Sequence, residues 1–221
     1  MMRGIVGYIA IGAATFAVLG LAMPVASTSG LYWAWTHNPG TALRGVDAMI
    51  KVTNPTVVSG SMCAAFDIMF FYNNDFFKIG WCKGTSRAGN TYGTVMVYWE
   101  QALSGSYSGG LMSSPGLSIG STYEFRAQYV RGSLNEWRSY VGYTNIKSTT
   151  FGYNYAQPSV QAEAHNTLDS FQGHFSGLQY GQLGPRSILW YPWNGYGGTG
   201  ANYPPFTQSI ISNTEWSFNG G

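Results

Sequence analysis

Charged residues are scarce in this chain. Lys and Arg number 11, Asp and Glu number 9, and together they make up 9% of the 221 residues, against about 25% in typical soluble domains. The formal net charge is only +2, and Arg3 is expected to leave with an N-terminal leader. Such a chain lacks the positive field that gathers nucleic acid. With 45% hydrophobic residues, it also lacks the low hydrophobicity and high charge of disordered proteins.

Cysteine and histidine are almost as rare. The three histidines, His37, His165 and His174, form no HxxxH spacing, and the two cysteines form no CxxC spacing, so no metal site is expected. The sequence contains no P-loop, dinucleotide fingerprint or GxSxG elbow. The glycines of WNGYGGTGANY follow no clear strand and are interpreted as a loop. We therefore expect no cofactor and find no support for a serine hydrolase.

The N-terminus contains a long apolar run instead. MMR is followed by an uncharged stretch over residues 4–22 and a tail of small residues, which is typical of a signal peptide. Cleavage after Ser27 would remove residues 1–27. The apolar stretch is nearly long enough to span a bilayer, so a retained membrane anchor is the alternative. Either case places residues 28–221 outside the cytoplasm, as a secreted or surface-exposed domain.

Residues 28–221 predict a single all-β domain, an antiparallel two-sheet sandwich. Aromatic residues make up 16% of the chain and glycines number 30, and short runs of Val, Ile, Tyr, Phe and Trp are broken by Gly, Asn, Pro and Ser. The expected strands are 46–53, 62–71, 76–83, 93–101, 121–130, 136–143, 158–166, 186–191 and a short strand in TEWSF near the end. The part after Gly173 is expected to be mostly long loops.

Two hairpins stand out in this pattern. In FDIMFF-YNND-FFKIGW, an Asn-Asn turn joins two apolar runs. Pairing Cys63 with Cys82 across it sets Asp67 opposite Lys78, and a disulfide is the default for two cysteines in an exported protein. In the second hairpin, over residues 122–143, one face is apolar and the other is charged. Its charges are interpreted as solvated cross-strand pairs.

The stretch SVQAEAHN, residues 159–166, places three different polar side chains on one predicted strand. Side chains alternate between the faces of a strand, so Gln161, Glu163 and His165 share one face while the small apolar residues between them occupy the other. The sequence therefore predicts a carboxyl group, an amide and an imidazole in a row.

The order of several segments resembles the neprosin-type glutamic peptidases and their small bacterial relatives. The matching pieces are FFKIGWCKG, YGTVMVYWE, the STYEFRAQY/EWRSYVGY hairpin, and VQAEAHN followed by QGHF, over roughly residues 45–178. The resemblance implies a lectin-like sandwich in which two carboxyl groups on one concave sheet work at acid pH. One carboxyl must be protonated while its neighbour is ionised.

Glu163 matches the second carboxyl of the family, but Lys78 occupies the position of the first. An ammonium group cannot share a proton with Glu163; it instead favours an ion pair that keeps Glu163 ionised. The resemblance therefore leaves enzymatic activity uncertain, with Glu163 and Lys78 as the candidate catalytic pair. Glu100 and Asp67 are the possible substitute carboxyl groups.

The expected partner is an extended peptide or a glycan. Side chains expected to bind it are Gln161, His165, Trp81, Trp190 and Trp193. Exposed aromatic rings often hold such ligands, and packing in the sandwich is the alternative role for each tryptophan. The preferred interpretation is a diverged peptidase-like binding domain. The alternatives are a lectin-like carbohydrate-binding module and a structural subunit of an envelope, filament or membrane complex, anchored by residues 4–22. The sequence does not indicate an oligomeric state.

Overall fold

The computed structural model describes residues 29–37, 42–58, 60–70, 75–85, 91–166, 168–169, 171–194, 198–201 and 207–220. The expected leader lies outside these residues. Within them, every regular element is a β-strand, and none is a helix long and apolar enough to cross a membrane.

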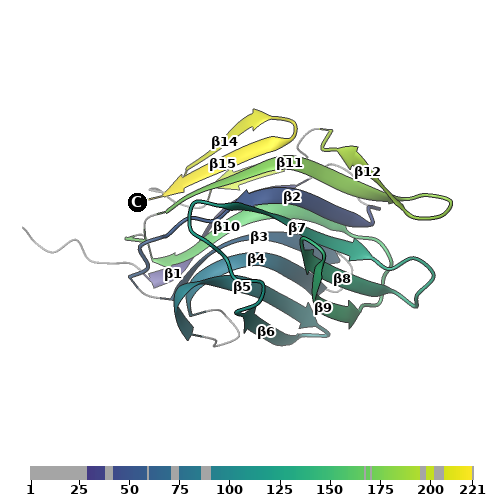
Figure 1. The fold of residues 1–221 in the computed structure, drawn as a ribbon, viewed down its shortest axis with the longest axis horizontal. Helices are drawn as coiled ribbons and strands as arrows, with labels where there is room; N and C mark the ends of the chain where they lie inside the picture. The colour runs from purple at the N-terminus through teal and green to yellow at the C-terminus, as the bar shows by residue number, and fades with distance from the viewer. Residues whose placement is uncertain are drawn as a thin grey trace, which may run out of the picture.

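The strands form two antiparallel sheets that face each other (Figure 1). The seven-stranded sheet has the order β13 (Gly198–Ala201), β1 (Ser29–His37), β10 (Gln157–Asn166), β3 (Ser61–Phe70), β4 (Asp75–Thr85), β5 (Thr91–Leu103) and β6 (Ser106–Met112). The eight-stranded sheet has the order β14 (Thr207–Ser212), β15 (Glu215–Gly220), β11 (Phe171–Leu183), β2 (Gly45–Lys51), β7 (Thr122–Tyr129), β8 (Glu136–Val141) and β9 (Thr144–Thr150), with β12 (Ile188–Pro192) paired to β11. The predicted antiparallel sandwich is confirmed.

The hydrophobic core lies between the sheets and follows the alternation of each strand. On β4, Phe77, Ile79 and Trp81 are fully buried in it, and on β10 Val160, Ala162 and Ala164 join them. The eight-stranded sheet contributes the alternate residues of β2, β7 and β8. Each sheet therefore turns its apolar face inward and its more polar face outward.

The register of both predicted hairpins is confirmed. Across β3 and β4, Cys63 lies opposite Cys82, and Asp67 lies opposite Lys78. Across β7 and β8, Arg126 lies opposite Tyr140 on the outer face. The side chains of β3 lie outside the described residues, so the disulfide stays a prediction.

The prediction for the last third of the chain was wrong. The long strand β11 runs through Gly173, Gly177 and Gly181, where loops were expected, and β13 lies inside the segment interpreted as a glycine loop. Side chains of neighbouring strands cover two of these glycines: a Cβ on Gly173 would lie 1.6 Å from Phe218 Cζ, and one on Gly181 would lie 2.7 Å from Ile188 Cγ2 and 3.3 Å from Trp190 Cζ3. At these two positions glycine therefore makes room for a neighbouring side chain and does not end the strand. Four other strands, β1, β6, β9 and β14, were not predicted.

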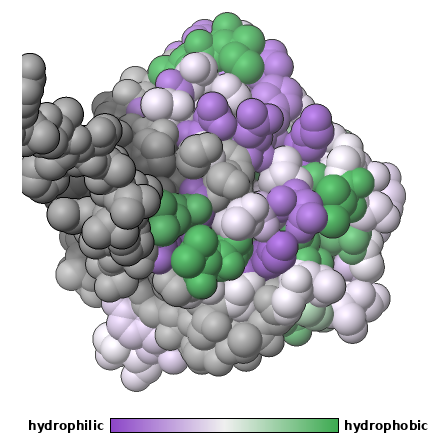
Figure 2. All heavy atoms as spheres, turned by 90° about the vertical axis from the view of Figure 1, so that its left-hand side faces the viewer, coloured by the Kyte–Doolittle hydropathy of each residue, from purple (hydrophilic) through white to green (hydrophobic). Residues whose placement is uncertain are grey.

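Among the described residues, apolar side chains are scattered at the end of the sandwich that carries the C-terminus (Figure 2). Figure 2 shows hydrophobic groups there separated by hydrophilic ones among the described residues. Exposed apolar residues of this kind, such as Ile210 and Ile211 on β14, are normal on soluble domains.

Candidate functional site

The residues singled out on β4 and β10 lie on the outer face of the seven-stranded sheet. Phe77, Ile79 and Trp81 point into the core, so the alternation of the strand turns Lys78 outward. On β10 the same argument turns Gln161 and Glu163 outward, because Val160 and Ala162 are buried in the core.

Lys78 and Glu163 form a buried ion pair. Lys78 Nζ lies 3.1 Å from Glu163 Oε2, and the two side chains are only 7% and 9% exposed. Gln161 Nε2 donates a second hydrogen bond to the same carboxylate oxygen at 3.2 Å. Lys78 Nζ also lies 5.0 Å from the ring centroid of Phe76, so an aromatic face adds to the cation's surroundings. Glu163 is therefore a buried, ion-paired carboxylate and not a solvent-exposed one.

The two partners come from different cross-strand rows. Glu163 lies in the row of Cys63 and Cys82, whereas Lys78 lies in the row of Asp67 and Ser159. The row between them holds Gln161, Ala65 and Gly80. One cross-strand row therefore separates the two partners of the ion pair.

A second buried carboxyl group lies on the neighbouring strand. Glu100 is the cross-strand partner of Lys78, its residue is 0% exposed, and Tyr98 donates its hydroxyl proton to Glu100 Oε2 at 2.7 Å. Glu100 Oε1 is buried and has no hydrogen-bond partner among the described residues. The structure thus places the possible substitute carboxyl on the same sheet face as Lys78, which the sequence could not establish.

The ion pair of Lys78 and Glu163 stabilises two opposite charges and does not favour proton transfer. An acid-type hydrolase needs two carboxyl groups that share a proton. Here Glu163 is paired with an ammonium group at hydrogen-bond distance, which stabilises the carboxylate form. Within the described residues, no three His, Cys, Asp or Glu side chains are close enough to hold a metal ion.

Two of the tryptophans expected to bind a ligand were predicted wrongly. Trp81 is 0% exposed and donates its indole N–H to Lys51 O at 3.1 Å, and Trp193 is 1% exposed. Both rings belong to the hydrophobic core, so neither can contact a ligand. Trp190 is partly exposed, but it lies on β12 of the other sheet. The side chains of His165 and Asp67 lie outside the described residues.

Sequence reasoning missed two contributors to the site, Tyr98 and Phe76. Both were available from alternation, because Tyr98 is two residues before Glu100 and Phe76 is two residues before Lys78. It also missed a carboxyl pair on the outer face of the eight-stranded sheet. There burial and the charge of Glu124 raise the pKa of Asp47 to about 7, although Arg126 opposes the shift, and the two carboxyl groups are joined by a hydrogen bond.

Comparisons with known proteins identify the fold. No family model and no curated protein matches the sequence. Among solved structures, SCP-B, a member of the eqolisin family of peptidases solved in a complex with the tripeptide Ala-Ile-His, superposes with a TM-score of 0.54 at 11% identity, over 89% of this chain and 100% of that chain.

Lectin-type sandwiches are also similar. Sheep galectin-11 gives a TM-score of 0.38 at 13% identity, over 61% of this chain and 93% of its own, and the chicken-liver agglutinin CG-16 gives 0.40 at 7%, over 67% and 98%. At these identities the likeness concerns the fold alone. The chain therefore shares the two-sheet sandwich of an eqolisin, a glutamic peptidase.

Proposed function

We propose that this protein is an exported binding domain that resembles neprosin-type glutamic peptidases and that holds an extended peptide without cleaving it. The observation that carries the proposal is the buried ion pair, in which Lys78 Nζ lies 3.1 Å from Glu163 Oε2. The bound tripeptide in the SCP-B structure supports a peptide as the ligand class. Gln161, beside Glu163, supplies an amide group on the same face.

The absence of proteolysis follows from the charge of Lys78. General acid catalysis needs a carboxyl group that carries a proton at the working pH, and the adjacent ammonium group disfavours that protonated form of Glu163. Glu100, the other carboxyl group on this face, is the cross-strand partner of Lys78 and accepts a hydrogen bond from Tyr98.

The first test is cleavage of a denatured protein substrate across pH 2–7 by the full-length protein and by Glu163→Gln and Lys78→Glu variants. We expect little or no cleavage by the wild type at any pH. Strong wild-type cleavage that Glu163→Gln abolishes would overturn the proposal and assign the protein as a peptidase.

The second test measures binding of fluorescent peptides derived from the same substrate. Removing one partner of a buried pair costs about 3–5 kcal/mol of stability, so the informative variant is Lys78→Met/Glu163→Gln, which leaves neither charge behind. We expect this variant to stay folded and to bind at least about tenfold more weakly, which is about 1.4 kcal/mol. Glu215→Gln, which removes a carboxylate from the other sheet, is the control. Equal binding by both variants would contradict the assignment of the site.

A further inference from the structure

The outer face of the eight-stranded sheet contains a second candidate site, separate from the ion pair. A pocket of about 330 Å³ opens there, which is within the size range of small-molecule sites. Six of the residues that line it carry the argument: Gln128, Arg131, Arg138, Tyr140, Ser187 and Trp190. They come from β7, β8 and β12 and from two turns that lie at the same end of the sandwich, on the right in Figure 1.

One cross-strand row forms the floor of this pocket. Reading across the sheet, Trp190 pairs with Gly181, Gly181 with Gly45, Gly45 with Gln128, and Gln128 with Arg138. Two adjacent glycines leave a hollow in the middle of the row, with an aromatic ring at one end and an amide and a guanidinium group at the other.

The indole of Trp190 fills part of this hollow. A Cβ placed on Gly45 would lie 2.9 Å from Trp190 Cη2, and one on Gly181 would lie 3.3 Å from Trp190 Cζ3. The ring therefore rests against the backbone of both glycine strands while Trp190 keeps part of its surface exposed. A ring supported in this way is a preformed flat apolar platform, which reduces the entropy lost on binding.

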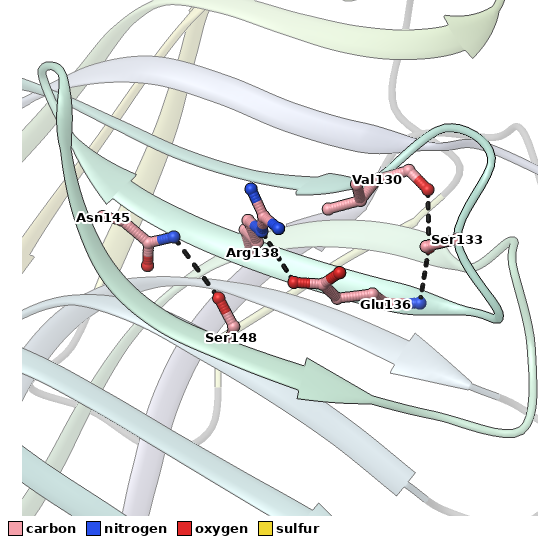
Figure 3. Close-up of polar contacts among 6 residues, drawn as sticks. All are labelled: Val130, Ser133, Glu136, Arg138, Asn145 and Ser148. Atoms are coloured by element: carbon pink, nitrogen blue, oxygen red, sulfur yellow. Dashed lines mark hydrogen bonds and ion pairs between the residues drawn. The ribbon is translucent and has the colours of Figure 1, made fainter.

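The charged side of the pocket is also held in place. Glu136 Oε1 accepts a hydrogen bond of 2.7 Å from Arg138 Nε (Figure 3). Arg138 also donates a hydrogen bond to Tyr140, which leaves the remaining guanidinium N–H groups for other acceptors. Arg131 lies in the β7–β8 turn, which the hydroxyl group of Ser133 stabilises. This hydroxyl donates a hydrogen bond to Val130 O at 2.6 Å and accepts one from Glu136 N at 2.9 Å. Gly132 and Asn135 take positive φ angles of 79° and 60° in this turn, as Gly and Asn do most readily.

We propose that this pocket binds an anionic saccharide, with a pyranose ring on the indole of Trp190 and its carboxylate on Arg131 and Arg138. Guanidinium groups match a carboxylate in a bidentate geometry, and Gln128 and Tyr140 offer hydrogen bonds to hydroxyl groups. A uronic acid joins an apolar ring face and a carboxylate in one rigid unit. An acidic peptide carries its carboxylate on a flexible side chain and matches this fixed spacing less well.

The test is calorimetric titration of the full-length protein with trigalacturonic acid, with neutral galactotriose and triglutamate as comparison ligands. We expect the acidic trisaccharide alone to bind and its affinity to fall with added salt. Trp190→Ala and Arg138→Ala should each weaken binding by at least about tenfold, or about 1.4 kcal/mol.

Two matched variants serve as controls. Tyr143→Ala removes an aromatic ring that is 99% exposed outside the pocket, and Lys51→Ala removes a positive charge from the far part of the same sheet; both should bind normally. The proposal is overturned if the wild type does not bind the acidic trisaccharide, if galactotriose or triglutamate binds equally well, or if the pocket variants bind like the controls. These outcomes are independent of peptide binding at Glu163, because the two sites lie on different sheets.

Discussion

The carboxyl group of Asp47 lies half-buried on the outer face of β2, opposite Arg126 of β7. Burial and the neighbouring Glu124 raise the pKa of Asp47 to about 7. An unfolded chain would instead titrate this group near 3.8. Between these values the folded protein holds a proton that the unfolded chain has released.

This difference predicts how stability depends on pH. Because the folded state binds the extra proton, the stabilisation is complete below about pH 4 and is lost as the pH rises towards 7. The slope from one group cannot exceed about 1.4 kcal/mol per pH unit. Urea unfolding of the wild type and of Asp47→Asn from pH 4 to pH 8 measures it.

Asp47→Asn should gain stability relative to the wild type as the pH rises, because an amide cannot ionise. Glu124→Gln should lower the pKa of Asp47, since it removes the neighbouring charge, and should reduce the same slope in part. A wild type whose difference from Asp47→Asn is constant over this range would contradict the shifted titration of Asp47.

At the candidate site, the alternation of side chains predicted which residues share a face of the sheet. It did not predict which of these side chains contact each other. The pairing of Lys78 with Glu163 followed from the resemblance and the hairpin register, and it is confirmed at 3.1 Å. The same alternation, applied to Trp81, would have placed that ring in the core, three residues from Lys78 and on the opposite face. The shared face of Tyr98 and Glu100 was available from alternation along β5. The position of Glu100 opposite Lys78 was not, because it depends on the register of β5 with β4.

At the scale of a strand, β11 shows why glycine is a poor indicator of loops in this protein. Gly173 lies opposite Phe218 of β15, and the ring of Phe218, 3% exposed, occupies the space of a Cβ. The glycine is needed for close packing between strands and does not terminate either of them.

Gly173→Ala should therefore destabilise the protein by about 1–3 kcal/mol, the usual cost of overpacking a core. The Phe218 ring would have to move, because the added Cβ would lie 1.6 Å from Cζ. Chemical denaturation measures the loss.

Gly152→Ala is the matched control, since Gly152 is exposed and an added Cβ meets nothing within 4 Å. It should leave the unfolding midpoint nearly unchanged. If the two alanine variants are equally stable, the ring of Phe218 is not held against Gly173.

Strands with a single apolar face and a turn at each end were predictable, and the others were not. The β3–β4 hairpin was found because its cysteines, apolar runs and Asn-Asn turn agree on one register. The strand β9, with the sequence TNIKSTT, buries only Ile146 among its seven residues, so no alternating pattern shows it. The strand β1 directly follows the predicted leader, and none of the expected strands covered its residues.

At the scale of the whole molecule, the apolar core lies between the sheets, and the polar clusters lie on the two outer faces. The buried ion pair occupies one face, while the carboxyl pair and the Trp190 pocket occupy the other. Changes on one face therefore need not disturb the other, and their effects on stability are expected to add.

Intact-mass analysis of the native protein, before and after reduction, tests two predictions about the whole chain. Export with cleavage predicts a mass that lacks residues 1–27, and a Cys63–Cys82 disulfide predicts two thiols that appear only after reduction. A full-length mass in the membrane fraction would instead support the anchored structural subunit. Two free thiols before reduction would contradict the disulfide.

The buried ion pair also determines how much stability each substitution at Lys78 or Glu163 costs. A single exchange of Lys78 or Glu163 for a neutral residue leaves one buried charge, at about 3–5 kcal/mol, out of the roughly 5–15 kcal/mol that stabilises a domain. Lys78→Glu differs in acid, because a protonated carboxyl group carries no charge. The single exchange Lys78→Glu thus gives a two-carboxyl site whose charge cost is small in acid, whereas at neutral pH it leaves two buried like charges side by side. The pH of the surroundings therefore sets the stability cost of a two-carboxyl site on this sandwich.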